Sequence, residues 1–233
     1  MQLHPFVCAL TELTFENSFN PYADRCKIYD HADAPERRAA VLSAMVTRAE
    51  STGADAIWIG RDLGHRGGRR TGLALTDDIH VSRHAERWGL SADRPTIGKA
   101  VVEQTAAVIW SMLSRIELGV FLWNVFPLHP HEEGNPFSNR QHNAKERRAG
   151  EVLLEELIRL LRPRRIIAIG NNAAEAAARL APLVPIIGVR HPSYGGQTQF
   201  RKQMNALYDN LPLQNELQLS PETSRYAEAR RLL

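Results

Sequence analysis

Four short segments dominated by consecutive apolar residues divide the chain. They are residues 56–60, 120–124, 165–169 and 186–190. Each is only a few residues long, is rich in β-branched or aromatic side chains, and is followed by glycine or polar residues. Continuous apolar runs of this kind are typical of strands buried on both faces of a parallel sheet. The pattern therefore predicts four parallel strands.

The segments between these runs have a different pattern, in which apolar residues recur every three or four positions. This spacing is typical of amphipathic helices. It predicts helices over residues 6–13, 36–52, 97–113, 144–161, 171–180 and 199–207. Strands that alternate with helices indicate an α/β protein. We expect a three-layer α/β/α fold with a central four-stranded parallel sheet.

Two stretches lack either pattern. Residues 127–143 contain three prolines and are predicted to form a long loop without regular structure. A loop of this length in a compact domain is usually functional. We expect a single domain over residues 1–211 with an irregular N-terminal elaboration, and a polar tail over residues 212–233 with a short helix.

The overall composition restricts the classes of protein only weakly. A hydrophobic content of 43% supports one sizeable core, and a formal net charge of +3 permits nucleic acid as a partner without requiring it. Two cysteines, Cys8 and Cys26, cannot supply the four thiolates of an iron–sulfur cluster. No segment approaches the roughly 20 apolar residues of a membrane span, and the first residues do not resemble a signal peptide. We therefore expect a cytoplasmic, monomeric protein without a membrane partner or an iron–sulfur cluster.

The loop after the first strand has an unusual composition. Residues 60–72 contain five glycines, four arginines and a single acid, Asp62. Glycine lets the backbone approach a ligand closely, and arginine suits phosphate. The glycine spacing fits neither a nucleotide-triphosphate loop nor a dinucleotide fingerprint. A surface turn with solvated arginines is the alternative interpretation.

Polar side chains follow three of the four predicted strands. Asp62, Asn124 and His191 stand at or just beyond the strand ends, and the carboxyl ends of parallel strands meet at one edge of a sheet. A carboxylate, an amide and an imidazole together offer a base, a selective hydrogen-bonding group and a donor. His129 and His131 also suggest metal ligands, but prolines interrupt them and we expect no metal site.

In their order and spacing these residues resemble the uracil-DNA glycosylase superfamily, over residues 20–204. Three motifs carry the resemblance. The first is Gly-Arg-Asp-Leu-Gly at 60–64 with Arg-Arg-Thr-Gly-Leu-Ala-Leu-Thr at 69–76, the second is Trp-Asn-Val-Phe-Pro at 123–127 with Asn-Pro-Phe-Ser-Asn-Arg at 135–140, and the third is His-Pro-Ser at 191–193. Together they resemble a bacterial uracil-DNA glycosylase-like protein with a divergent first motif.

The resemblance implies a monofunctional DNA glycosylase that hydrolyses the N-glycosidic bond of uracil, or of a related deaminated or mismatched base, without a cofactor. Asp62 and His191 would be the catalytic residues. Asp62 would activate water or stabilise the cationic sugar, and His191 would donate a hydrogen bond to the departing base. The alternatives are that Asp62 only pairs with a nearby arginine, and that His191 is a core histidine.

The resemblance also implies a set of base-binding residues. They are Gly60, Arg61, Leu63, Gly64, Leu75 and Asn124. Asn124 would read the amide edge of the base. Arg61, Leu63, Gly64 and Leu75 replace, respectively, a neutral or acidic residue, a proline, the tyrosine that excludes a 5-methyl group, and the phenylalanine that stacks on the base. We therefore expect weak binding of plain uracil, and an Asp62 carboxylate that Arg61 holds ionised but blunts as a base.

The remaining candidates would contact DNA. Those for phosphate are Arg66, Arg69, Arg70, Arg140, Arg190 and Ser193. Tyr194, beside two glycines, is a candidate wedge into the helix that the flipped base leaves. Two other functions stay open. One is a catalytically weak or inactive lesion-binding module of the same fold, and the other is an enzyme that uses the basic loop for a nucleotide or sugar phosphate.

Overall fold

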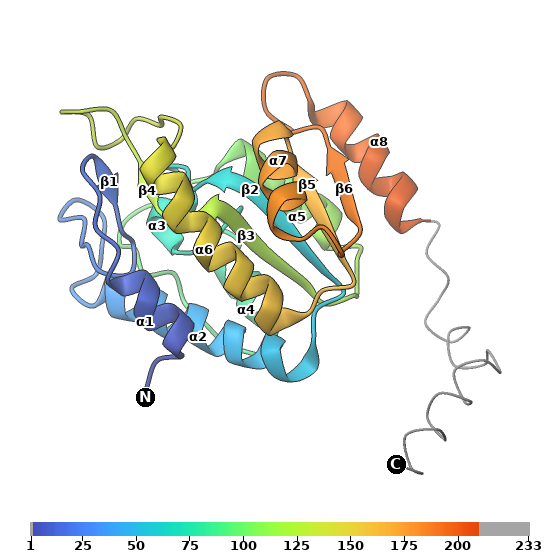
Figure 1. Cartoon of the computed structure of the whole chain (residues 1–233). Helices are drawn as coiled ribbons and strands as arrows, with labels where there is room; N and C mark the ends of the chain where they lie inside the picture. The colour runs from blue at the N-terminus through green and yellow to red at the C-terminus, as the bar shows by residue number, and fades with distance from the viewer. Residues whose placement is uncertain (1, 210–233) are drawn as a thin grey trace, which may run out of the picture.

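A central sheet of four parallel strands organises the computed structural model, which describes residues 2–209 (Figure 1). The strand order is β3-β2-β5-β6. The strands are β2 Ala56–Asp62, β3 Val120–Phe126, β5 Arg165–Ile169 and β6 Ile186–Val189. The predicted α/β class and four-stranded parallel sheet are confirmed. The helix predicted within residues 212–233 lies outside the described residues.

Helices cover both faces of the sheet (Figure 1). They are α1 Pro5–Thr11, α2 Ala34–Thr52, α3 Gly68–Thr71, α4 Val81–Glu86, α5 Gln104–Leu113, α6 Ala144–Leu161, α7 Asn171–Leu180 and α8 Gln197–Tyr208. Side chains alternate along β2, because successive residues of a strand point to opposite faces. Ile57 and Ile59 pack in the core beneath α1, α2, α6 and α7, whereas Trp58 packs in the core beneath α5 and α8.

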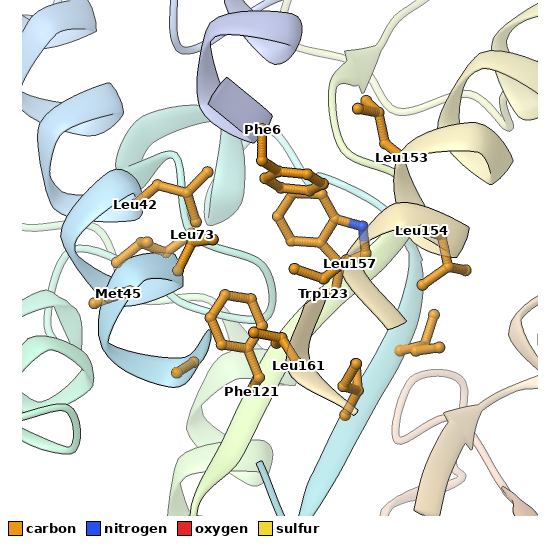
Figure 2. Packing of buried hydrophobic residues seen from close by; sticks show 14 of the residues in the cluster. Phe6, Leu42, Met45, Leu73, Phe121, Trp123, Leu153, Leu154, Leu157 and Leu161 are labelled. Carbon is orange, nitrogen blue, oxygen red and sulfur yellow. The ribbon is translucent and has the colours of Figure 1, made fainter. Parts of the chain in front are cut away.

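The larger core is built mainly from aromatic and leucine side chains. Figure 2 shows Phe6 of α1 and Leu157 of α6 meeting Phe121 and Trp123 of β3. Helix α6 also approaches β3 unusually closely near its N-terminal end. A Cβ atom on Gly150 would lie 2.1 Å from the carbonyl oxygen of Val125, so only glycine fits there. This contact fixes the start of α6 beside the carboxyl end of β3.

The structure differs from the prediction in three respects. Strands β2 and β3 continue two residues further than expected, since Gly60 still pairs with Asn124 and Asp62 with Phe126. Helix α5 begins at Gln104 rather than near residue 97, because the Glu103 side chain caps it and Gly98 takes a positive φ of 74°.

The third difference concerns the loop at 127–143, where the prediction of no regular structure is wrong. It contains β4 His129–Pro130, which pairs antiparallel with β1 Ser18–Phe19. A two-stranded pairing of this length tolerates proline, because an edge position needs no donor on its outer side. This pairing ties the N-terminal segment to the loop that borders the carboxyl edge of the central sheet.

Candidate active site

A cleft of about 450 Å³ lies at the carboxyl edge of the sheet. Residues at or after the ends of all four central strands line it, as do the first residues of α7. Asp62, Asn124 and His191 all belong to its lining. The sequence thus correctly placed these three side chains in one cleft, because parallel strands present their carboxyl ends together.

The Asp62 carboxylate is buried and has a partner on each oxygen. Arg61 Nε donates to Oδ2 at 2.5 Å, and His142 Nδ1 contacts Oδ1. The ring of Phe126 packs edge-to-face against His142, with 6.1 Å between the ring centroids. The ion pair that the sequence allowed between Asp62 and an arginine is therefore present. With one partner on each oxygen, the carboxylate is held in a fixed orientation as a negative charge in the cleft.

His142 is a site residue that the sequence analysis did not identify. It lies 80 positions from Asp62 in the chain. The usable signal is the capping box that follows it, in which the Asn143 side chain accepts from the Glu146 amide and the Glu146 side chain accepts from the Asn143 amide. That motif fixes the start of α6, and a helix that follows β3 starts at the same sheet edge as Asp62.

Asn124 lies at the floor of the cleft and is only 1% exposed. Its Oδ1 atom is buried and has no hydrogen-bond partner among residues 2–209. A buried acceptor without a partner costs roughly 1–3 kcal/mol. Gly60 leaves the space that the amide occupies, because a Cβ atom there would lie 2.4 Å from Oδ1. The amide therefore lines the cleft with an acceptor that lacks a protein partner and lies against Gly60.

His191 is held as a neutral ring with a defined tautomer. The Ser193 backbone N–H donates to its Nδ1 at 3.1 Å, and the Ser193 hydroxyl contacts the same atom at 2.7 Å. Because Nδ1 accepts, the ring proton is on Nε2. Burial, aided by the charges of Arg61 and Arg190, lowers the pKa of His191 to about 4. At neutral pH the ring is thus an uncharged donor.

The other predicted base-binding residues surround these groups. Arg61, Leu63, Gly64 and Leu75 line the cleft, whereas Gly60 lies behind Asn124. A side chain at Gly64 would meet open space, so this wall of the cleft is open. Leu75 takes a positive φ of 55°, and Trp110 Nε1 donates to its carbonyl oxygen at 3.2 Å. The apolar contact above the cleft is thereby fixed in position.

Arg69 and Arg70 are almost wholly buried and bonded to other protein groups, which does not support the prediction that they bind phosphate. Arg69 donates to the Tyr29 hydroxyl at 2.9 Å and to His129 Nδ1 at 3.1 Å. Arg70 Nε donates to Asp78 at 2.9 Å. Both side chains are buried, because the short helix α3 turns them inward. Their guanidinium groups hold the loop to the protein.

Arg140 makes several internal contacts, but its side chain is partly exposed and lines the cleft, so its role as a phosphate ligand stays a prediction. Its Nη1 and Nη2 atoms donate to the two carboxylate oxygens of Glu146, at 2.7 and 2.6 Å. Nε donates to the carbonyl oxygen of His131 at 2.9 Å, and Nη2 also contacts the carbonyl of Asn17. The group ties the loop at 127–143 to the capping box of α6.

Four other predicted DNA contacts are accessible to different degrees. Arg66 and Arg190 are exposed, and Arg190 borders the cleft. Tyr194 is 97% exposed at the rim of the cleft. Ser193 is partly buried, and its amide and hydroxyl both contact His191. Its observed contacts therefore orient the histidine ring.

Glu103 is a second lining residue that the sequence did not identify. It caps α5, with its two oxygens accepting from the amides of Thr105 and Ala106 at 3.2 and 3.3 Å. Burial raises the pKa of this carboxyl. The cleft thus has a second acidic group. Backbone amides contact the Glu103 carboxyl, whereas the side chains of Arg61 and His142 contact Asp62.

Two other features bear on partners. Both ring nitrogens of His129 are occupied, since Nδ1 accepts from Arg69 and Nε2 donates to the carbonyl of Ser138 at 2.8 Å. Within residues 2–209, no three histidine, cysteine or acidic side chains gather in a group able to hold a metal ion. No helix in the same part of the chain has the length and apolar character needed to cross a membrane.

The layered α/β/α fold thus brings an amide, a neutral imidazole and a carboxylate to one edge of the sheet. A family model described as the Uracil DNA glycosylase superfamily matches residues 50–211, and the chain belongs to this superfamily. No curated protein matches the chain.

Two solved structures were found to align with the chain. Wild-type SMUG2 from Pedobacter heparinus aligns with a TM-score of 0.58 and 15% identity, over 88% of this chain and 97% of that chain. Wild-type UNG from Nitratifractor salsuginis aligns with a TM-score of 0.39 and 15% identity, over 76% of this chain and 84% of that chain. The likeness to SMUG2 supports the fold.

Proposed function

We propose that the protein is a monofunctional DNA glycosylase that hydrolyses the N-glycosidic bond of a deaminated or mismatched base in DNA. Membership of the uracil-DNA glycosylase superfamily supports this activity. The observation that carries the proposal is the buried, unpaired Oδ1 of Asn124 in the same cleft as the neutral ring of His191. One group can recognise an amide edge, and the other can stabilise the charge that develops on it.

Recognition begins when the target nucleotide leaves the stack and its base enters the cleft. Uracil and related bases carry an N–H group beside a carbonyl. Asn124 Oδ1 accepts from that N–H, which removes the cost of the unpaired acceptor. The cleft volume of about 450 Å³ is in the range of small-molecule sites.

In the chemical step, the bond between the sugar C1′ and the base nitrogen breaks, and its electron pair leaves with the base. Negative charge accumulates on the base oxygen, to which the His191 Nε2–H donates. Positive charge accumulates on the sugar, and the Asp62 carboxylate stabilises it. A water molecule then adds to C1′, and the proton that it loses passes through solvent to the departed base anion. Because Arg61 and His142 occupy both carboxylate oxygens, electrostatic stabilisation is the main role of Asp62.

The lining of the cleft indicates the substrate range. Open space at Gly64 leaves room beside a 5-methyl group, and Leu75 provides an aliphatic surface where a ring would stack more strongly. We therefore propose a substrate range that is not limited to plain uracil and that includes larger deaminated or mismatched bases.

The contacts of Asp62 favour a second candidate, a lesion-binding module with little or no turnover. An ion-paired, buried carboxylate cannot readily deprotonate water, whereas Asn124 and His191 would still bind a flipped base. The two functions differ in the cleavage step only.

The deciding experiment uses labelled oligonucleotides that contain uracil, hypoxanthine, xanthine or thymine opposite guanine. A glycosylase produces free base and an alkali-labile site, and Asp62→Asn lowers the rate by at least about tenfold while DNA affinity changes little. A parent protein that binds a damaged strand preferentially but releases no base from any substrate would support the binding module. Equal excision by Asp62→Asn would show that Asp62 is only an ion-pair partner.

A further inference from the structure

A second hollow, of about 330 Å³, lies beside the cleft. Its lining residues are Ile28, Tyr29, His65, Arg66, Arg70, Val101 and Phe137. We propose that this second pocket binds an unpaired nucleobase of the same DNA strand that carries the target nucleotide. The inference rests on the proposed function, since it requires DNA in the cleft.

The two hollows are separated by a single loop. Leu63, Gly64 and Gly68 line the cleft, whereas His65, Arg66 and Arg70, from the same stretch of chain, line the second pocket. A strand whose target nucleotide enters the cleft therefore has its neighbouring nucleotides at this loop. The second pocket is within reach of the strand without any movement of the fold.

The aromatic side chains of the second pocket form a supported platform. Phe137 is exposed, and its ring centroid lies 6.2 Å from that of Tyr29. The guanidinium of Arg70 lies 4.1 Å from the Tyr29 ring centroid, and that of Arg69 lies 5.3 Å from the Phe137 ring centroid. These buried cations fix the rings from within. A nucleobase stacks on such a surface whatever its sequence.

Polar groups at the second pocket match a nucleotide better than an apolar peptide. The buried Nδ1 atom of His65 has no hydrogen-bond partner within residues 2–209. The Asn139 side-chain oxygen accepts from the His65 amide at 2.9 Å and holds the residue in place. Burial lowers the pKa of His65, which lines the second pocket as a neutral ring. Arg66, which is exposed, supplies a cation for the adjoining phosphate.

The test compares two single strands of equal length at one salt concentration. One carries ordinary bases, and the other is a base-less strand of tetrahydrofuran phosphates. Phe137→Ala should weaken binding to the base-bearing strand about tenfold and leave binding to the base-less strand unchanged. Ile28→Ser should act in the same direction by a smaller factor, and because Ile28 is 71% exposed this variant should fold normally.

Leu183→Ala is the matched control, since Leu183 is 96% exposed and precedes β6 at the opposite edge of the sheet. It should change neither affinity. The opposing result is that Phe137→Ala and Ile28→Ser bind both strands like the parent, or lose equal affinity for both. In either case the second pocket binds no base, and this inference is refuted while the proposed function stands. If the parent binds neither these strands nor damaged duplex, the proposed function fails as well.

Discussion

Arg69→Gln tests whether the arginines of the glycine-rich loop hold the fold or hold DNA. The Arg69 guanidinium donates to the Tyr29 hydroxyl at 2.9 Å and to His129 Nδ1 at 3.1 Å. It also lies 3.7 Å from the centroid of the Phe19 ring. These contacts connect the loop to the N-terminal segment and to β4. We expect the substitution to lower the free energy of unfolding.

The magnitude follows from the contacts that are lost. A hydrogen bond with one charged partner contributes roughly 1.5–3 kcal/mol. A desolvated cation–π contact contributes about 2 kcal/mol. Glutamine is shorter and can replace at most one of the two hydrogen bonds, so loss of the other bond and of the cation–π contact amounts to about 4 kcal/mol. This loss is smaller than a typical total stability of roughly 5–15 kcal/mol, so the variant should still fold.

Urea unfolding followed by tryptophan fluorescence measures this loss, and Arg66→Gln is the matched control. Arg66 is exposed on the same loop, so its unfolding free energy should stay within about 0.5 kcal/mol of the parent. The Arg66→Gln variant should bind DNA more weakly. The slope of the logarithm of its binding constant against the logarithm of salt concentration should be smaller in magnitude by about one. If Arg69→Gln instead keeps the parent's stability and loses DNA affinity as Arg66→Gln does, Arg69 is a phosphate contact and its structural role is refuted.

Three further variants test the cleft and the core. Arg61→Gln frees one Asp62 oxygen and should raise the single-turnover excision rate severalfold; an unchanged rate would show that the ion pair does not restrain the carboxylate. Gly60→Ala places a Cβ atom 2.4 Å from the Asn124 amide oxygen and should abolish selective binding of damaged strands, with about 1–3 kcal/mol lost in urea unfolding. Burial lowers the pKa of His84 to about 3, so stability is fully present above the unfolded pKa near 6.5 and falls as the pH drops towards 3. Between pH 5 and 6, His84→Gln should reduce the pH slope of the unfolding free energy by almost one proton.

The sheet and the location of the cleft were predictable because both follow from local pattern. Continuous apolar runs specify buried parallel strands. Parallel strands in turn bring Asp62, Asn124 and His191 to one edge, whatever the details of the loops between them. Even the two-residue error at the end of β2 left Asp62 in the cleft, since the strand only extends towards that edge.

The contacts of the charged side chains were not predictable, because their partners lie far away in the sequence. Arg69 bonds to residues 40 and 60 positions away, and Asp62 contacts His142 across 80 positions. From composition alone, arginines in a glycine-rich loop are expected to be solvent-exposed and to bind phosphate. Only the packing of the loop against the N-terminal segment shows that Arg69 and Arg70 turn inward.

The cleft separates binding from hydrolysis more clearly than its residue types suggest. Asn124 has an acceptor that awaits a ligand, and His191 has a tautomer that is already set, so both are prepared to hold a base. Asp62, in contrast, already has both oxygens occupied. An Asn124 variant would therefore weaken a glycosylase and a binding module alike. Base release by the parent, and its change in the Asp62 and Arg61 variants, distinguishes them, because the two functions differ in how much the carboxylate contributes once the base is bound.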